Sequence, residues 1–95
     1  MASAANQQRR EIHFSGRVQG VGFRYTTRQI ASRFDVCGFV KNLHDGRVLL
    51  VVEGEAEAID GLTAAIEAQM DRHIQHKQVS VSPSTGEFDR FEVRH

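Results

Sequence analysis

Residues 16–25 have the sequence Gly16-Arg17-Val18-Gln19-Gly20-Val21-Gly22-Phe23-Arg24-Tyr25, and this stretch separates two hydrophobic patterns of different period. Apolar and polar side chains alternate over residues 11–18, as they do in a half-buried β-strand. After the stretch, apolar or small side chains recur at every third or fourth position, as on one face of an amphipathic helix. That face comprises Phe23, Thr26, Thr27, Ile30, Ala31 and Phe34. The stretch therefore predicts a strand, a glycine-rich loop and a helix, in that order.

The rest of the chain predicts four further strands and a second helix. The turn Leu43-His44-Asp45-Gly46 separates β-rich segments at 36–43 and 47–53, and Asp-Gly in this position favours a tight hairpin. A helix is expected from Glu55 to about Met70, with a buried face of Ile59, Leu62, Ala65, Ile66 and Met70. The expected later elements are a loop over 71–77 and two strands, one around Val79 and Val81 and one around Phe91 and Val93.

This order of elements is β-α-β-β-α-β followed by a short terminal strand. It predicts an α+β fold, the ferredoxin-like (split βαβ) sandwich, with two helices on one face of an antiparallel sheet. We expect residues 1–10 to form a flexible N-terminal tail and residues 11–95 to form one domain. We also expect the strand that contains Asn42 to lie beside the first strand, which would bring Asn42 near Arg24.

The composition is that of a small globular domain, since the chain has 95 residues with 40% hydrophobic and 25% charged side chains. No apolar run approaches the roughly 18 residues of a transmembrane helix, and the N-terminal residues lack the apolar segment of a secretory signal. The single cysteine, Cys37, cannot form an internal disulfide, which favours a reducing, cytoplasmic location. We expect it to be a small buried side chain rather than a reactive thiol.

The charges are unevenly distributed although the formal net charge is zero. Residues 1–50 carry eight basic and three acidic side chains, whereas residues 51–95 carry four basic and nine acidic ones. Ten of the 12 basic side chains are arginine, which binds oxyanions in a planar, bidentate manner. The asymmetry indicates an anionic ligand for the N-terminal half, but oppositely charged solvated surfaces would produce the same counts.

The glycine-rich loop is the strongest candidate site. Glycine permits positive φ angles and a close approach of the backbone to a ligand, and the first amides of the following helix lack partners within the helix. Such a loop can bind an anion, and Arg24 in the first helical turn is placed to complete the site. The alternative is a tight turn beside a solvated arginine. The loop lacks the Gly-Lys-Ser/Thr ending and the strict Gly-x-Gly-x-x-Gly spacing of nucleotide-binding loops.

The other polar residues give weaker signals. No second cysteine or acidic cluster completes a metal site with His73 and His76, so we expect no bound metal. Nothing near the loop resembles a nucleophile and base pair. Asn42 precedes the hairpin turn, where an asparagine often bonds to its own backbone.

Two linked motifs and the C-terminal segment give the chain a specific resemblance. Residues 16–25 resemble one signature of the acylphosphatase family. A second signature of that family is similar to the stretch Gly38-Phe39-Val40-Lys41-Asn42-Leu43 followed by Asp45-Gly46-Arg47-Val48. The ending Phe91-Glu92-Val93-Arg94 is also similar to that family. The resemblance covers residues 11–95, which makes this segment an acylphosphatase-like domain. The segment 71–77 departs from the family pattern, which would have a Gly-Pro-like turn there.

The resemblance implies an enzyme that hydrolyses the carboxyl–phosphate bond of acyl phosphates to a carboxylate and inorganic phosphate. It implies that Arg24 binds the phosphate together with the backbone amides of the loop Gln19, Gly20, Val21, Gly22 and Phe23, and that Asn42 orients the attacking water. It implies a small-molecule substrate and neither metal nor cofactor. We expect a monomer without nucleic-acid or membrane partners.

Three other interpretations remain at this point. An RNA-recognition motif has the same order of elements, but it carries aromatic residues on the third strand, where this chain has Val48-Leu49-Leu50-Val51-Val52. A non-catalytic module could bind a small anion at the same loop. Domains similar to this one also occur at the N-terminus of hydrogenase-maturation proteins that process carbamoyl phosphate.

Overall fold

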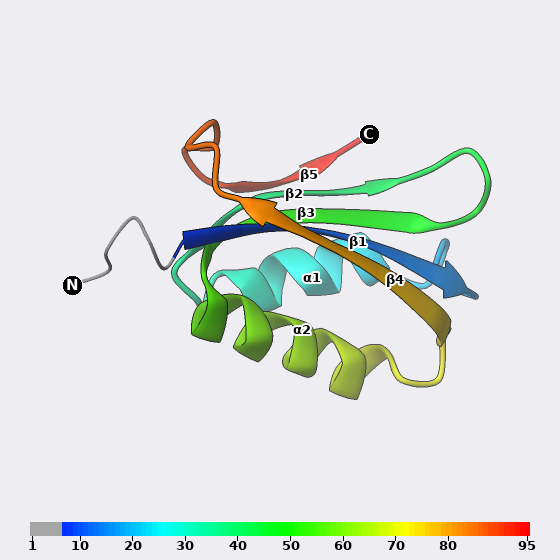
Figure 1. Ribbon diagram of the computed structural model, residues 1–95. Coiled ribbons are helices and arrows are strands. Elements are labelled where there is room, and N and C mark those ends of the chain that lie inside the picture. The colour runs from blue at the N-terminus through cyan, green and yellow to red at the C-terminus, as the bar shows by residue number, and fades with distance from the viewer. Residues whose placement is uncertain (1–6) are drawn as a thin grey trace.

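The computed structural model describes residues 7–95 and has the expected order of elements (Figure 1). The elements are β1 (Gln7–Gly16), α1 (Phe23–Ala31), β2 (Val36–Asn42), β3 (Val48–Glu55), α2 (Ala56–Met70), β4 (Ile74–Pro83) and β5 (Phe91–Arg94). Both helices lie on the same face of one five-stranded sheet, and the other face of the sheet carries no helix. The ferredoxin-like α+β fold is therefore confirmed.

The sheet differs from the expected one in its pairing. Its strand order is β4-β1-β3-β2-β5, and the pairs β4–β1, β1–β3 and β3–β2 are antiparallel. The last strand, β5, pairs parallel with β2, so the sheet is mixed rather than antiparallel. The expectation that the strand of Asn42 lies beside the first strand was wrong, because β3 lies between β1 and β2. The apolar run of β3 is buried on both faces, which suits a central strand.

Two boundaries predicted from the sequence were also wrong. β1 begins at Gln7, because residues 7–10 pair with residues 52–55 of β3; residues 7–10 are therefore strand and not tail. Residues 1–6 of the expected tail lie outside the described residues. β4 begins at Ile74, so the expected loop 71–77 is reduced to residues 71–73. Both extensions consist mostly of polar residues, so the hydrophobic pattern did not indicate them. Backbone pairing does not require an apolar residue at each position.

The hydrophobic core lies between the sheet and the two helices. Ile12 and Phe14 of β1 point into it, and the ring of Phe14 packs against that of Phe23 with 5.1 Å between centroids. This contact joins the end of the first strand to the first residue of α1. The other fully buried residues of the core include Val18, Ile30, Val40, Val48, Leu50, Val52, Ile59, Leu62 and Ile66. Packing of Val18 and Phe23 thus anchors both ends of the glycine-rich loop.

Cys37 lies on β2 and is half-buried rather than fully buried. Its Sγ is 3.8 Å from the backbone oxygen of Glu53. Desolvation and the nearby carboxylates of Glu53, Asp35 and Asp89 raise the pKa of the thiol. A raised pKa reduces the thiolate population, which agrees with the expectation of an unreactive side chain.

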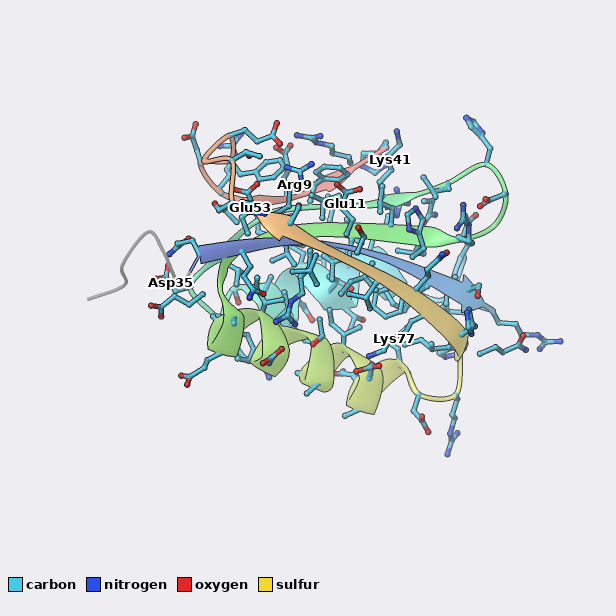
Figure 2. The ribbon with its side chains drawn as sticks, in the orientation of Figure 1. Arg9, Glu11, Asp35, Lys41, Glu53 and Lys77 are labelled. Carbon is cyan, nitrogen blue, oxygen red and sulfur yellow. The ribbon has the colours of Figure 1, made fainter. Side chains whose placement is uncertain are left out.

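A buried carboxylate on the helix-free face of the sheet holds the loop between β4 and β5. The side chain of Glu53 is 1% exposed and lies beside Arg9, whose Nη1 donates to Oε2 at 3.1 Å (Figure 2). The same carboxylate accepts hydrogen bonds from the Ser84 hydroxyl and from the amides of Thr85 and Gly86 at 2.8–3.0 Å. Burial opposes ionisation of Glu53, but hydrogen bonds from Thr85, Ser84 and the Gly86 amide outweigh it and lower the pKa to about 2.

Glu53→Ala is expected to reduce the free energy of unfolding at pH 7 by about 3 kcal/mol, because it removes a hydrogen-bonded buried charge and leaves its donors unsatisfied. The pKa of Glu53 is lower in the folded state, so its stabilisation is present above about pH 5 and is lost as the pH falls toward 2. Urea unfolding at several pH values measures both effects. The control is Glu92→Ala, which removes a 43% exposed carboxylate. Equal stability of the two variants would contradict the assigned role.

Candidate functional site

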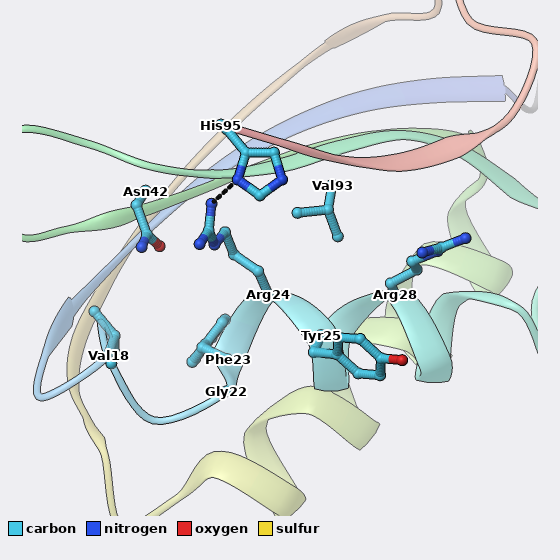
Figure 3. Close-up of a pocket in the computed structure, with 10 residues that line it drawn as sticks. Val18, Gly22, Phe23, Arg24, Tyr25, Arg28, Asn42, Val93 and His95 are labelled. Atoms are coloured by element: carbon cyan, nitrogen blue, oxygen red, sulfur yellow. Dashed lines mark hydrogen bonds between the residues drawn. The ribbon is translucent and has the colours of Figure 1, made fainter.

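One cavity of about 350 Å³ lies where the glycine-rich loop, the start of α1, the end of β2 and the end of β5 meet (Figure 3). It is lined by Val18, Gly20, Gly22, Phe23, Arg24, Tyr25, Arg28, Asn42, Val93 and His95. The cavity brings Arg24 and Asn42 together, as the sequence predicted. Of the expected loop residues, Gly20, Gly22 and Phe23 line it, whereas Gln19 and Val21 do not.

The loop backbone exposes unpartnered amides at the start of α1. Gly20 and Gly22 both have a φ angle of 77°, which a residue with a side chain adopts only with strain, although a Cβ at either position would contact nothing. Gly22 is the N-cap, and the first helical hydrogen bond runs from the Thr26 amide to the Gly22 oxygen at 3.0 Å. The amides of residues 23–25 precede it and have no acceptor within the helix, which favours binding of an anion.

Gln19 joins this loop to the β2–β3 hairpin. Its side-chain amide nitrogen donates to the backbone oxygens of Leu43 at 2.7 Å and Arg47 at 3.0 Å. Leu43 directly follows Asn42, so this contact holds the end of β2 against the loop. The two candidate segments therefore meet although β1 and β2 are not neighbours in the sheet. In this structure the Gln19 side chain binds the hairpin and not the cavity.

Arg24 is held by the end of β5. Its Nη1 donates to the backbone oxygen of Arg94 at 3.2 Å and lies 3.2 Å from Nδ1 of His95. Figure 3 shows the guanidinium extending from α1 toward Asn42 and His95. A guanidinium has five N–H donors, so two contacts through one nitrogen leave others for a ligand.

Asn42 lies on the side of β2 that faces the helices and the cavity (Figure 3). Its Oδ1 is buried and has no hydrogen-bond partner among residues 7–95. The turn interpretation of Asn42 gains no support, because Asp45 supplies the turn contact by accepting from the Arg47 amide at 3.1 Å. A buried oxygen without a partner is costly, which indicates that a ligand or a water molecule bonds to it in the working site.

The cavity lining is cationic. It contains Arg24 and Arg28 but no aspartate or glutamate. Sequence reasoning missed Arg28, Tyr25, Val93 and His95 as lining residues. The spacing of Arg28, four positions after Arg24, places both on one helical face and could have revealed it. The residues of β5 gave no such signal, because they reach the site through a pairing across some 50 residues of chain.

Two features of residues 7–95 bear on the expected partners. No three histidine, cysteine, aspartate or glutamate side chains in this part of the chain are grouped so that they could hold a metal ion. No helix of the described part is long and apolar enough to cross a membrane.

The chain is similar to several known proteins in sequence and in structure. The family model described as Acylphosphatase matches residues 10–93. An acylphosphatase of Rubrobacter xylanophilus is 44% identical over 95 residues, covering 99% of this chain and 86% of that protein. The crystal structure of acylphosphatase from Bacillus subtilis has a TM-score of 0.82 at 31% identity, covering 93% of this chain and 99% of that one. The structure of T. kodakarensis HypF has a TM-score of 0.72 at 31% identity, covering 93% of this chain and 12% of that one.

Proposed function

This chain belongs to the acylphosphatase family, and from that membership we propose how its own residues hydrolyse an acyl phosphate. The chain is an acylphosphatase, which converts an acyl phosphate to a carboxylate and inorganic phosphate. In our proposal, Arg24 and the amides of the loop 19–23 bind the phosphoryl group, and Asn42 orients the attacking water. Residues 11–95 form the catalytic domain. Residues 7–10 extend the first strand of that domain.

The observation that carries this proposal is the convergence of Arg24 and Asn42 on one cavity that no aspartate or glutamate lines. Arg24 offers donors to the equatorial phosphoryl oxygens, and the amides at the start of α1 add further donors for them. The unpartnered Oδ1 of Asn42 offers an acceptor to a water O–H. These groups supply the charge stabilisation and the positioning that the reaction needs.

The chemistry explains why no general acid is required. The water oxygen attacks phosphorus, the bond between phosphorus and the acyl oxygen breaks, and the electron pair leaves with the carboxylate. The conjugate acid of that carboxylate has a pKa of about 4, so it departs without a proton. Asn42 cannot accept the proton of the water, which passes to a phosphate oxygen in our proposal. Positioning and charge stabilisation then supply most of the rate.

We also propose that the chain acts as a cytoplasmic monomer on a small molecule, without metal, nucleic acid or membrane partners. The single half-buried cysteine supports a reducing compartment. The third strand, β3, carries no aromatic residue, which disfavours RNA binding of the RNA-recognition-motif type.

The direct test is turnover of benzoyl phosphate, followed by ultraviolet absorbance, with and without excess chelator. We expect steady hydrolysis that the chelator leaves unchanged and that inorganic phosphate inhibits competitively. Binding of phosphate without hydrolysis would instead indicate the non-catalytic anion-binding module. Activity that depends on added metal would contradict the metal-free mechanism.

A further inference from the structure

The cavity extends beyond the residues assigned to the phosphoryl group. Its remaining part is lined by Tyr25, by Arg28, which lies one helical turn beyond Arg24 on α1, and by Val93 of β5. In Figure 3, Val93 lies between the Arg24 end of the cavity and Arg28, whose guanidinium points away from Arg24. The volume of about 350 Å³ is typical of a small-molecule site and exceeds what a phosphoryl group alone needs.

The proposed reaction geometry places the acyl group in this second part. In phosphoryl transfer, the attacking and leaving oxygens lie roughly in line on opposite sides of phosphorus. Asn42 orients the water at one end of the cavity, so the leaving carboxylate lies on the opposite side of Arg24. Figure 3 shows Val93 and Arg28 on that side. The acyl chain therefore runs toward Arg28.

Arg28 carries a positive charge that the described residues leave unpaired. The guanidinium groups of Arg9, Arg10, Arg47 and Arg94 each contact a carboxylate. The guanidinium of Arg28 makes no ion pair or side-chain hydrogen bond with residues 7–95, and no aspartate or glutamate side chain lines the cavity that it shares with Arg24. Tyr25 and Val93, which line the same cavity, offer apolar surface to a short hydrocarbon chain.

We propose that this enzyme favours acyl phosphates whose acyl group carries a second negative charge at its far end, and that Arg28 is the residue that recognises this charge. The inference rests on the proposed function, because it uses the orientation that Arg24 and Asn42 impose. Side chains four positions apart on a helix have Cβ atoms about 5–6 Å apart. Because the Arg28 guanidinium points away from Arg24, the two guanidinium groups lie further apart than these Cβ atoms, which leaves room between them for the monophosphate of a short dicarboxylic acid. An uncharged acyl group of the same length would gain only the apolar contacts.

The experiment compares two substrates with the same trans four-carbon skeleton, fumaryl monophosphate and crotonyl phosphate. They differ in a terminal carboxylate against a methyl group, and the trans double bond prevents the carboxylate from attacking its own acyl carbon. The measured quantity is the ratio of kcat/KM for fumaryl to crotonyl phosphate. We expect this ratio to fall about fivefold in Arg28→Gln, because a factor of about five is the upper end of what an exposed ion pair contributes. In the wild type the ratio should also fall when salt is added, since salt screens the ion pair.

Arg33→Gln is the matched control, because Arg33 is an exposed arginine just beyond α1 that does not line the cavity. It should leave the ratio unchanged. The inference is overturned if Arg28→Gln lowers kcat/KM equally for both substrates, or if the ratio responds to Arg33→Gln as strongly. Failure of the proposed function is distinguishable, because the wild type would then hydrolyse neither substrate.

Discussion

Replacing Arg24 by alanine should lower kcat/KM for benzoyl phosphate by at least about 10²–10³-fold. The substitution removes a charged donor to a phosphoryl group, and the loss of one such donor typically has an effect of this size. Since Arg24 is the guanidinium that extends toward Asn42, no other side chain of the lining replaces it without rearrangement. The affinity for inorganic phosphate, measured as a competitive inhibition constant, should weaken in parallel.

Arg24→Lys tests whether geometry matters as well as charge. Lysine retains the charge but lacks the planar fork, and it cannot reproduce the contacts with the Arg94 oxygen and His95 while also holding a ligand. We expect a substantial loss of activity in this variant too. Arg33→Ala controls for the removal of one positive charge. Turnover close to the wild-type rate in Arg24→Ala, with an unchanged melting temperature, would refute the role of this residue.

Asn42→Ala should lower kcat by about 10²-fold while inorganic phosphate still binds with similar affinity. The carboxamide acts on the water and not on the phosphate in the proposed mechanism, and misplacing a reacting group typically has an effect of this order. Steady-state kinetics with phosphate as inhibitor separate the two quantities.

The matched control for Asn42 is Asp45→Ala in the same hairpin. Asp45 accepts from the Arg47 amide and side chain, so its loss loosens the turn without removing a group from the cavity. If Asn42→Ala abolishes phosphate binding together with kcat, or if Asp45→Ala lowers kcat as much, Asn42 has a structural role.

The sequence predicted the order of elements because each segment of the core has a clear hydrophobic period. The alternation at Ile12 and Phe14 and the helical spacing from Phe23 to Ala31 match the observed burial. The strand ends at Gln7 and Ile74 were not predictable from this signal. Residues 7–10 are polar and half-buried, and β4 is largely exposed at the edge of the sheet, so neither region shows the contrast on which the prediction depends.

The candidate site was predictable where it follows from local sequence and not where it follows from tertiary pairing. The loop glycines and Arg24 adjoin one another in the chain, and the resemblance added Asn42. By contrast, Val93 and His95 reach the cavity only because β5 pairs parallel with β2. The side chain of Gln19 likewise makes long-range contacts, with the hairpin 24 and 28 residues away.

Because β5 lies at the edge of the sheet, the site can lose its structure while the rest of the protein stays folded. This strand has four residues, pairs with one neighbour and contributes only half-buried or exposed side chains. Edge segments of this kind detach at a lower free energy than central strands. If β5 detaches, Arg24 loses the Arg94 oxygen and His95, whereas the layers formed by β1, β3 and α2 keep their contacts. Such a partly opened molecule would retain most of its secondary structure and would still be inactive.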